Sequence, residues 1–164
     1  MHTATKVTVL ALALVAAGAV TGQAQNNATV NVTAAVQQPV VVVKTRDLDF
    51  GLVFPGVNKQ ITLGSASAGT FAVTGQASAS VNLSFVVPGN LNLGPTLLPV
   101  TWDGSWNTAN AAGGTTFTPS AALTPATLSG TGGLFVFVGG TVAPIVSQAP
   151  GNYTGTVTMT VTYQ

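Results

Sequence analysis

Residues 79–87 read ASVNLSFVV, and this stretch decides the predicted fold class. Its odd-numbered side chains, from Ala79 to Val87, are small or apolar, and serine or asparagine occupies the even positions 80, 82 and 84. Successive side chains of a β-strand point to opposite faces of the sheet, so a period of two is typical of a strand with one buried face. We therefore expect a strand here, with the odd-numbered side chains on one face.

Similar segments recur along the chain after residue 25. Short runs rich in Val, Thr and Phe are separated by Gly, Pro, Asn and Ser, and no stretch keeps a helical stripe of apolar residues for three turns. The pattern predicts an all-β protein built as a two-sheet sandwich, with a closed barrel as the alternative, because periodicity alone does not separate the two. The expected strands are 28–36, 40–48, 59–63, 70–75, 79–87, 97–102, 115–118, 134–138, 141–146 and 153–163.

The chain divides into three parts in this prediction. Residues 1–24 combine a basic group at Lys6, an apolar run too short to span a bilayer comfortably and small residues at the end, which is the pattern of a signal peptide for export. Residues 25–39 form an N-terminal extension and hinge, and residues 40–164 form one β-domain. Within that domain, 94–133 is rich in small residues and is expected to be a partly irregular excursion across one end of the sandwich.

The composition argues against most catalytic and metal chemistry. The chain has no Cys and no Glu, and its only His is His2, inside the expected signal. Neither a Ser–His nor a Cys–His pair can then form, so we expect no enzyme, no cofactor, no metal and no small-molecule substrate. A calcium site at Asp47 and Asp49 is an alternative, but Lys44 and Arg46 beside them favour a solvated strand edge.

Charge argues against nucleic acid as a partner. Beyond residue 24 three basic side chains balance three aspartates, so there is no basic patch of the kind that binds phosphate backbones. Surfaces with few charges and little net charge tend to associate. An exported protein of this composition is expected to end up packed in an assembly.

The segment 25–39, QNNATVNVTAAVQQP, carries a second regular alternation. Pro39 separates it from the next apolar run, because a central strand cannot lose a ladder N–H there. One interpretation is an ordinary first strand; the other is a donor strand that inserts into a neighbouring subunit, a known mode of recognition. The donor face would consist of Ala28, Val30, Val32, Ala34 and Val36.

The end of the sequence, TGTVTMTVTYQ at residues 154–164, alternates in the same way. It resembles the ends of subunits assembled by the chaperone–usher pathway, which carry an alternating strand, a penultimate tyrosine and a glycine fourteen residues from the end. Tyr163 and Gly151 occupy these two positions here.

The body is similar to a bacterial family of pilin-like domains of unknown function. The matching motifs are LDFG at 48–51, FAVTGQA at 71–77, VGGT at 138–141 and PGNYTG at 150–155, running into VTY at 161–163. The resemblance implies an immunoglobulin-like sandwich that lacks its final strand and is completed by a donor strand. It also implies a periplasmic chaperone that lends a strand and an usher pore in the outer membrane.

The leading hypothesis is a structural subunit of an extracellular fibre, a fimbria or a biofilm-matrix filament, formed from identical subunits. Its acceptor groove and chaperone-binding strand would consist of Gly151, Tyr153, Val157, Met159, Val161, Tyr163, Val41 and Val43. The alternative is a secreted carbohydrate-binding or adhesin domain. Its contact surface would be Trp102, Asp103 and Trp106, since tryptophans beside a turn can stack on sugars. These tryptophans have an ordinary interpretation too, with Trp102 packed in the core and Trp106 covering it.

Overall fold

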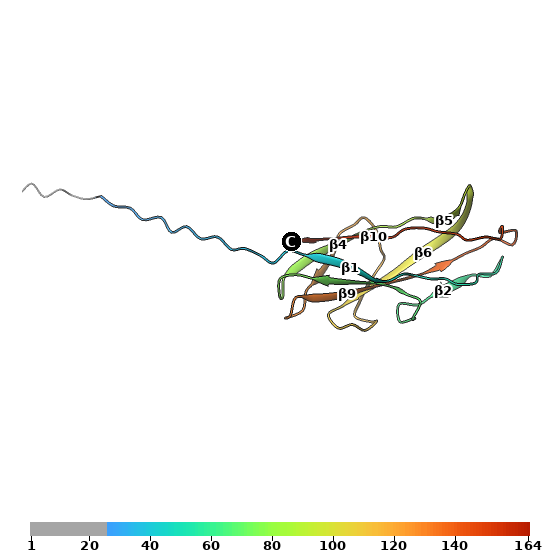
Figure 1. The fold of residues 1–164 in the computed structure, drawn as a ribbon, viewed down its shortest axis with the longest axis horizontal. Coiled ribbons are helices and arrows are strands. Elements are labelled where there is room, and N and C mark those ends of the chain that lie inside the picture. Colours follow the sequence, from blue (N-terminus) through green and yellow to red (C-terminus); the bar gives the residue numbers. More distant parts are fainter. Residues whose placement is uncertain (1–25) are drawn as a thin grey trace, which may run out of the picture. The chain divides into compact units, whose positions relative to one another are not determined.

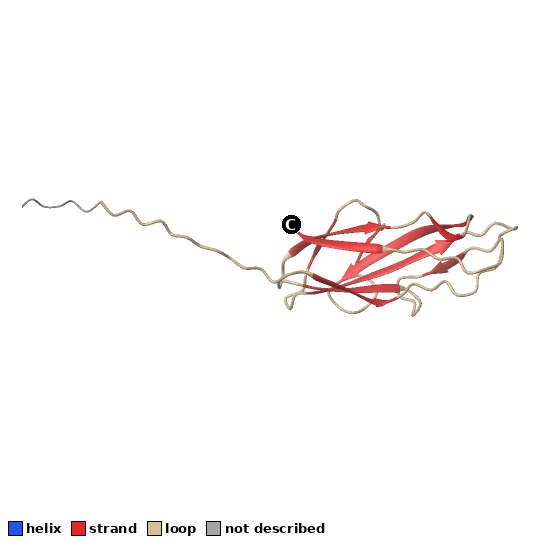
Figure 2. Ribbon diagram, turned by 45° about the horizontal axis from the view of Figure 1, so that its top comes forward, coloured by secondary structure: helices blue, strands red, loops and turns tan. Residues whose placement is uncertain are grey.

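The structure is a computed structural model that describes residues 26–164, and this part of the chain is all-β, without a helix (Figure 2). The expected signal peptide, 1–24, lies outside the described residues. The chain separates into two units, Met1–Ala35 and Val36–Gln164. The described part of the first unit contains no strand, and all ten strands belong to the second.

The larger sheet of the second unit is antiparallel and follows the order β1-β3-β9-β6-β5 (Figure 1). Two short strands extend it, since β2 pairs with the end of β9 and β7 pairs with β6. The bounds are β1 Val41–Arg46, β2 Lys59–Ile61, β3 Gly69–Thr74, β5 Asn90–Leu93, β6 Thr96–Asn107, β7 Thr115–Phe117 and β9 Gly133–Val142.

The smaller sheet is also antiparallel and has the order β10-β4-β8. Its strands are β4 Ser80–Val86, β8 Thr124–Thr127 and β10 Thr158–Tyr163. The two sheets pack together as a β-sandwich. The expected all-β sandwich is therefore confirmed.

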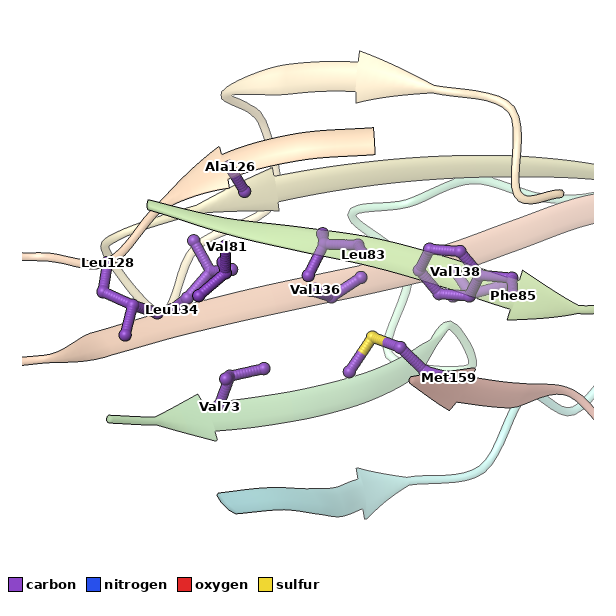
Figure 3. Close-up of a cluster of buried hydrophobic side chains, with 10 residues drawn as sticks. All are labelled: Val73, Val81, Leu83, Phe85, Ala126, Leu128, Leu134, Val136, Val138 and Met159. Atoms are coloured by element: carbon purple, nitrogen blue, oxygen red, sulfur yellow. The ribbon is translucent and has the colours of Figure 1, made fainter. Parts of the chain in front are cut away.

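The main core lies between the two sheets and follows the alternation of β4. Val81, Leu83 and Phe85 are at most 2% exposed, and the ring of Phe85 stacks on Phe117 with centroids 5.2 Å apart. Figure 3 shows the ten buried side chains of this cluster between the strands: Val73, Val81, Leu83, Phe85, Ala126, Leu128, Leu134, Val136, Val138 and Met159.

A second, smaller core cluster lies on the larger sheet. It consists of Leu91, Leu98, Val100 and Val142, and all four come from β5, β6 and β9. No strand of the smaller sheet contributes to it. Side chains from the irregular segments after β1 and before β10 cover it instead, among them Phe50, Val53 and Tyr153.

Several strand predictions were wrong. The expected strands 97–102 and 115–118 correspond to β6, which extends to Asn107, and to β7, whereas β5 and β8 had no counterpart in the prediction. The stretch 94–133 is therefore less irregular than expected. Pro125 lies in β8, an edge strand, where a missing N–H is tolerated. The expected strand 141–146 is not separate, since residues 141 and 142 end β9.

No segment between residues 26 and 164 is a helix of the length and apolarity that a membrane crossing requires.

Candidate functional site

Each sheet ends in a strand that has a partner on one side only. In the described chain β1 pairs with β3 alone and β10 pairs with β4 alone. The outer edge of each therefore presents backbone N–H and C=O groups to which a further strand can bind. Such an edge can accept a strand from another chain by main-chain hydrogen bonding.

The inner face of β10 is the alternating set that the sequence indicated. Met159 pairs with Phe85, Val161 with Leu83 and Tyr163 with Val81, so all three lie on the core side of the smaller sheet. Met159 is 8% exposed, and the others pack half-buried against the main core, as does Val157 just before the strand. The threonines between them are exposed.

The inner face of β1 is formed by the alternate set of valines. Val42 pairs with Val73, which is 1% exposed, so the side chain of Val42 points into the core. Val41 and Val43 lie on the other face and are 49% and 52% exposed. Residues 40–43 are all valine, and only the register with β3 decides which pair faces inward. The sequence-based assignment of Val41 and Val43 to the groove therefore differs from their observed position.

An elongated groove of about 880 Å³ lies between the segments that adjoin these two edges. One wall runs from Lys44 to Pro55, and the other from Gln148 to Val157. The floor is the inner face of the larger sheet and is formed largely by apolar side chains. It includes Phe71, Leu91, Leu98, Trp102, Val138 and Val142.

The second wall is attached to the sandwich by specific contacts. Thr154 and Asn92 exchange two backbone hydrogen bonds, of 2.8 and 3.0 Å, which join this segment to β5. The hydroxyl of Tyr153 donates to the carbonyl oxygen of Ala149 at 2.8 Å and accepts from the amide of Gln148 at 2.7 Å. Gly151 has a φ of +149° and lies directly against Leu93, where a side chain would collide.

Tyr163, in the last strand β10, joins the smaller sheet to the point where the chain enters β1 and to the turn after β3. Its hydroxyl donates to the carbonyl oxygen of Gln38 at 2.6 Å and accepts from the backbone N–H of Gln76 at 2.7 Å. The C-terminal strand is thereby tied to the point where the chain enters the body.

The described part of the first unit carries exposed apolar side chains. The alternation of residues 28–36 places valines on one face, and Val30 and Val32 are 84% and 90% exposed. Val36, the first residue of the second unit, is 97% exposed. Residues 26–39 form no strand, so the expected strand 28–36 is absent from the single chain.

Residues 40–163 match a protein family described as "Domain of unknown function (DUF4402)". The chain belongs to this family. No curated protein matches the chain. The DUF4402 match begins one residue after Pro39, and it contains both groove walls and the strands β1 and β10 with their open edges.

The two tryptophans of the DUF4402 domain do not form a surface with Asp103. Trp102 and Trp106 lie on the inner side of β6 and pack against the core, and the Trp102 indole N–H donates to the carbonyl oxygen of Pro88 at 2.7 Å. Asp103 lies between them on the strand and faces the opposite side. There it borders a separate hollow of about 600 Å³ with Gln60 and Thr116. The three residues therefore cannot stack together on one sugar.

The two aspartates considered for calcium have local partners. Asp47 forms an ion pair with Lys44 at 2.7 Å, and Asp49 accepts the backbone N–H of Gly51 at 2.7 Å. Among residues 26–164 no group of three or more acidic, His or Cys side chains comes together. The solvated strand edge is therefore the simpler interpretation of this segment.

The sequence reading missed the floor of the groove. Phe71, Leu98 and Val138 come from three strands that are distant in sequence, and no local pattern links them. Phe50 and Val53 were also missed. Phe50 lies within the LDFG motif and Val53 in the apolar run that follows it, and both come after the end of the expected strand 40–48.

Proposed function

We propose that this DUF4402 chain is a structural subunit of an extracellular fibre, and that residues 28–36 of one copy fill the groove of the next. One observation carries the proposal: a groove with a largely apolar floor lies between the segments that adjoin β1 and β10, and each of these strands has one open edge. The same chain carries an alternating segment in which Val30 and Val32 are exposed to solvent. It could therefore supply both the inserted strand and the groove of a strand-exchange contact.

The energy of such a contact is sufficient for a fibre without covalent links. Burial of three valine side chains contributes roughly 5–9 kcal/mol as an upper bound, at about 1.5–3 kcal/mol each. Each ladder hydrogen bond adds about 0.5–1.5 kcal/mol. A domain is stable by only about 5–15 kcal/mol in total, so one inserted strand is a large addition.

Composition supports an assembled state over a free one. Only 4% of the residues are charged, and the six charged side chains after residue 24 sum to zero. Little electrostatic repulsion opposes the packing of like subunits. The same inventory, with no Cys and no Glu, leaves little for acid–base or nucleophilic chemistry, so we assign the chain no enzymatic activity.

The resemblance to pilin-like subunits extends the proposal to assembly and location. In this scheme the chain is exported through the periplasm and a chaperone strand occupies the groove first. An usher in the outer membrane then replaces that strand with the donor segment of the next copy. The product is a cell-surface homopolymer, a fimbria or a biofilm-matrix filament.

The test compares two double variants of the donor segment. Val30→Asp with Val32→Asp places two carboxylates on the apolar face, and Asn31→Asp with Thr33→Asp places the same two charges on the opposite face. Electron microscopy and sedimentation should show single folded subunits for the first variant and filaments of wild-type length for the second. Filaments of normal length from the first variant, or from a chain without residues 25–36, would contradict the proposal.

A further inference from the structure

One end of the second unit carries an unusual group of exposed apolar side chains. We call Leu52, Phe54, Val57, Ile145 and Val146 the end patch. Their exposed fractions run from 58% for Val57 to 86% for Val146. They lie on two loops at the end of the body remote from the C-terminal residue (Figure 1).

Hydrogen bonds hold the two loops against each other. The N–H of Gly56 donates to the carbonyl oxygen of Ile145 at 3.1 Å, and the N–H of Val57 donates to Phe54 within the first loop at 3.1 Å. A methyl group added at Gly56 would lie 3.2 Å from a side-chain methyl of Val146. The two loops that carry the five side chains are therefore in direct contact. Contiguous exposed apolar patches of this kind mark contacts with other molecules.

The same loops form the mouth of the groove. Leu52, Val53 and Pro55 line one side of it, and Pro144 and Gln148 line the other. At the opposite end of the open side, Tyr163 bridges Gln38 and Gln76. We therefore expect an inserted strand to leave the groove at the mouth, beside the end patch, because Tyr163 and its partners occupy the opposite end.

The short connection after the donor segment brings the donor's own body to that mouth. Val36 is the last apolar residue of the donor face, and Gln38 is already fixed to the body by the hydroxyl of Tyr163. Two Cα–Cα steps span at most about 7.6 Å. The body of the donating copy must therefore abut the mouth into which its segment is inserted.

We propose that the end patch is the second contact of the fibre, and that it packs against the chain-entry end of the neighbouring copy, around Gln38 and Gln76. This inference rests on the proposed strand exchange and adds a body-to-body interface to it. None of Val36, Gln38 and Gln76 is charged, since the six charged side chains of the described chain lie at positions 44, 46, 47, 49, 59 and 103.

The absence of cysteine from the chain permits a direct test by cross-linking. The double variant Val146→Cys with Gln76→Cys, treated with a short bis-maleimide, should give a ladder of dimers, trimers and longer chains from intact fibres. The matched control is Val86→Cys with Gln76→Cys, since Val86 is 70% exposed but lies on β4, away from the patch. The control should give no ladder.

A second measurement separates this inference from the strand exchange itself. The variant Phe54→Ser with Val146→Ser should bind a synthetic peptide of residues 26–37 as the wild type does, in the background of a chain lacking residues 25–36. In the full chain it should raise the subunit concentration needed for fibre growth by about tenfold, as expected for the loss of one apolar contact. Fibres that form normally and give no ladder would overturn the end contact alone; absence of peptide binding and of fibres from the wild type would overturn the proposed function.

Discussion

The hydroxyl of Tyr163 and the carbonyl oxygen of Gln38 are joined by a hydrogen bond of 2.6 Å across 125 positions of sequence. The same hydroxyl accepts the N–H of Gln76 at 2.7 Å. One side chain thus connects the last strand, the entry point of the chain and the turn after β3.

Tyr163→Phe should lower the free energy of unfolding by about 1–2 kcal/mol. The substitution removes two hydrogen bonds worth about 0.5–1.5 kcal/mol each and leaves the packing of the ring. Urea unfolding of the full chain measures the change. Thr162→Ala, next to it on the exposed face of β10, is the control and should change the stability by less than about 0.5 kcal/mol. Equal losses for both variants would argue against the bridge.

The orientation of β1 gives a second prediction. Val42→Thr should destabilise the fold by about 1–2 kcal/mol, because it places a hydroxyl on the face that packs on Val73 and the main core. Val43→Thr should have almost no effect, since that side chain is 52% exposed on the opposite face. Thermal unfolding of the pair measures the difference. A larger loss for Val43→Thr would mean that the register of β1 and β3 is wrong.

Replacement of Trp102 and of Trp106 by phenylalanine is expected to lower the stability of the fold by different amounts. Trp102→Phe loses the 2.7 Å hydrogen bond to Pro88 and should cost about 0.5–1.5 kcal/mol beyond the change in packing. The buried indole nitrogen of Trp106 has no hydrogen-bond partner among the described residues, so Trp106→Phe removes an unsatisfied donor. Trp106→Phe should therefore cost less than Trp102→Phe. Chemical denaturation, followed by circular dichroism because the fluorophore changes, ranks the two variants.

The groove wall can be tested at a glycine. Gly151→Ala should destabilise the domain by about 1–3 kcal/mol, because φ there is +149° and the new methyl group would collide with Leu93. Gly89→Ala is the matched control, since no atom lies within 4 Å of its added methyl group. Differential scanning calorimetry should show a clear fall in Tm for the first variant and little change for the second. If Gly151→Ala also weakens binding of the 26–37 peptide, the wall takes part in the contact.

The local pattern of apolar and polar residues was enough to predict the fold class. It was also enough to predict which face of the clearly alternating strands is buried. Val81, Leu83 and Phe85 are in the core, and Met159, Val161 and Tyr163 face the same way, as the period of two requires. β5 and β8 carried no comparable signal. Each has four residues, and each is held by pairing with a longer neighbour rather than by its own propensity.

The sequence by itself determined that this chain is a β-protein with two alternating ends and almost no charge. It could not assign the faces of a run such as 40–43, in which every side chain is valine; the pairing of Val42 with Val73 decided that. Nor could the sequence predict that Phe71, Leu98 and Val138 lie together on the floor of the groove, because β3, β6 and β9 meet only through long-range pairing. Alternation is a local property of the sequence. The open edges and the groove depend instead on how the strands pair, which leaves β1 and β10 with a partner on one side only.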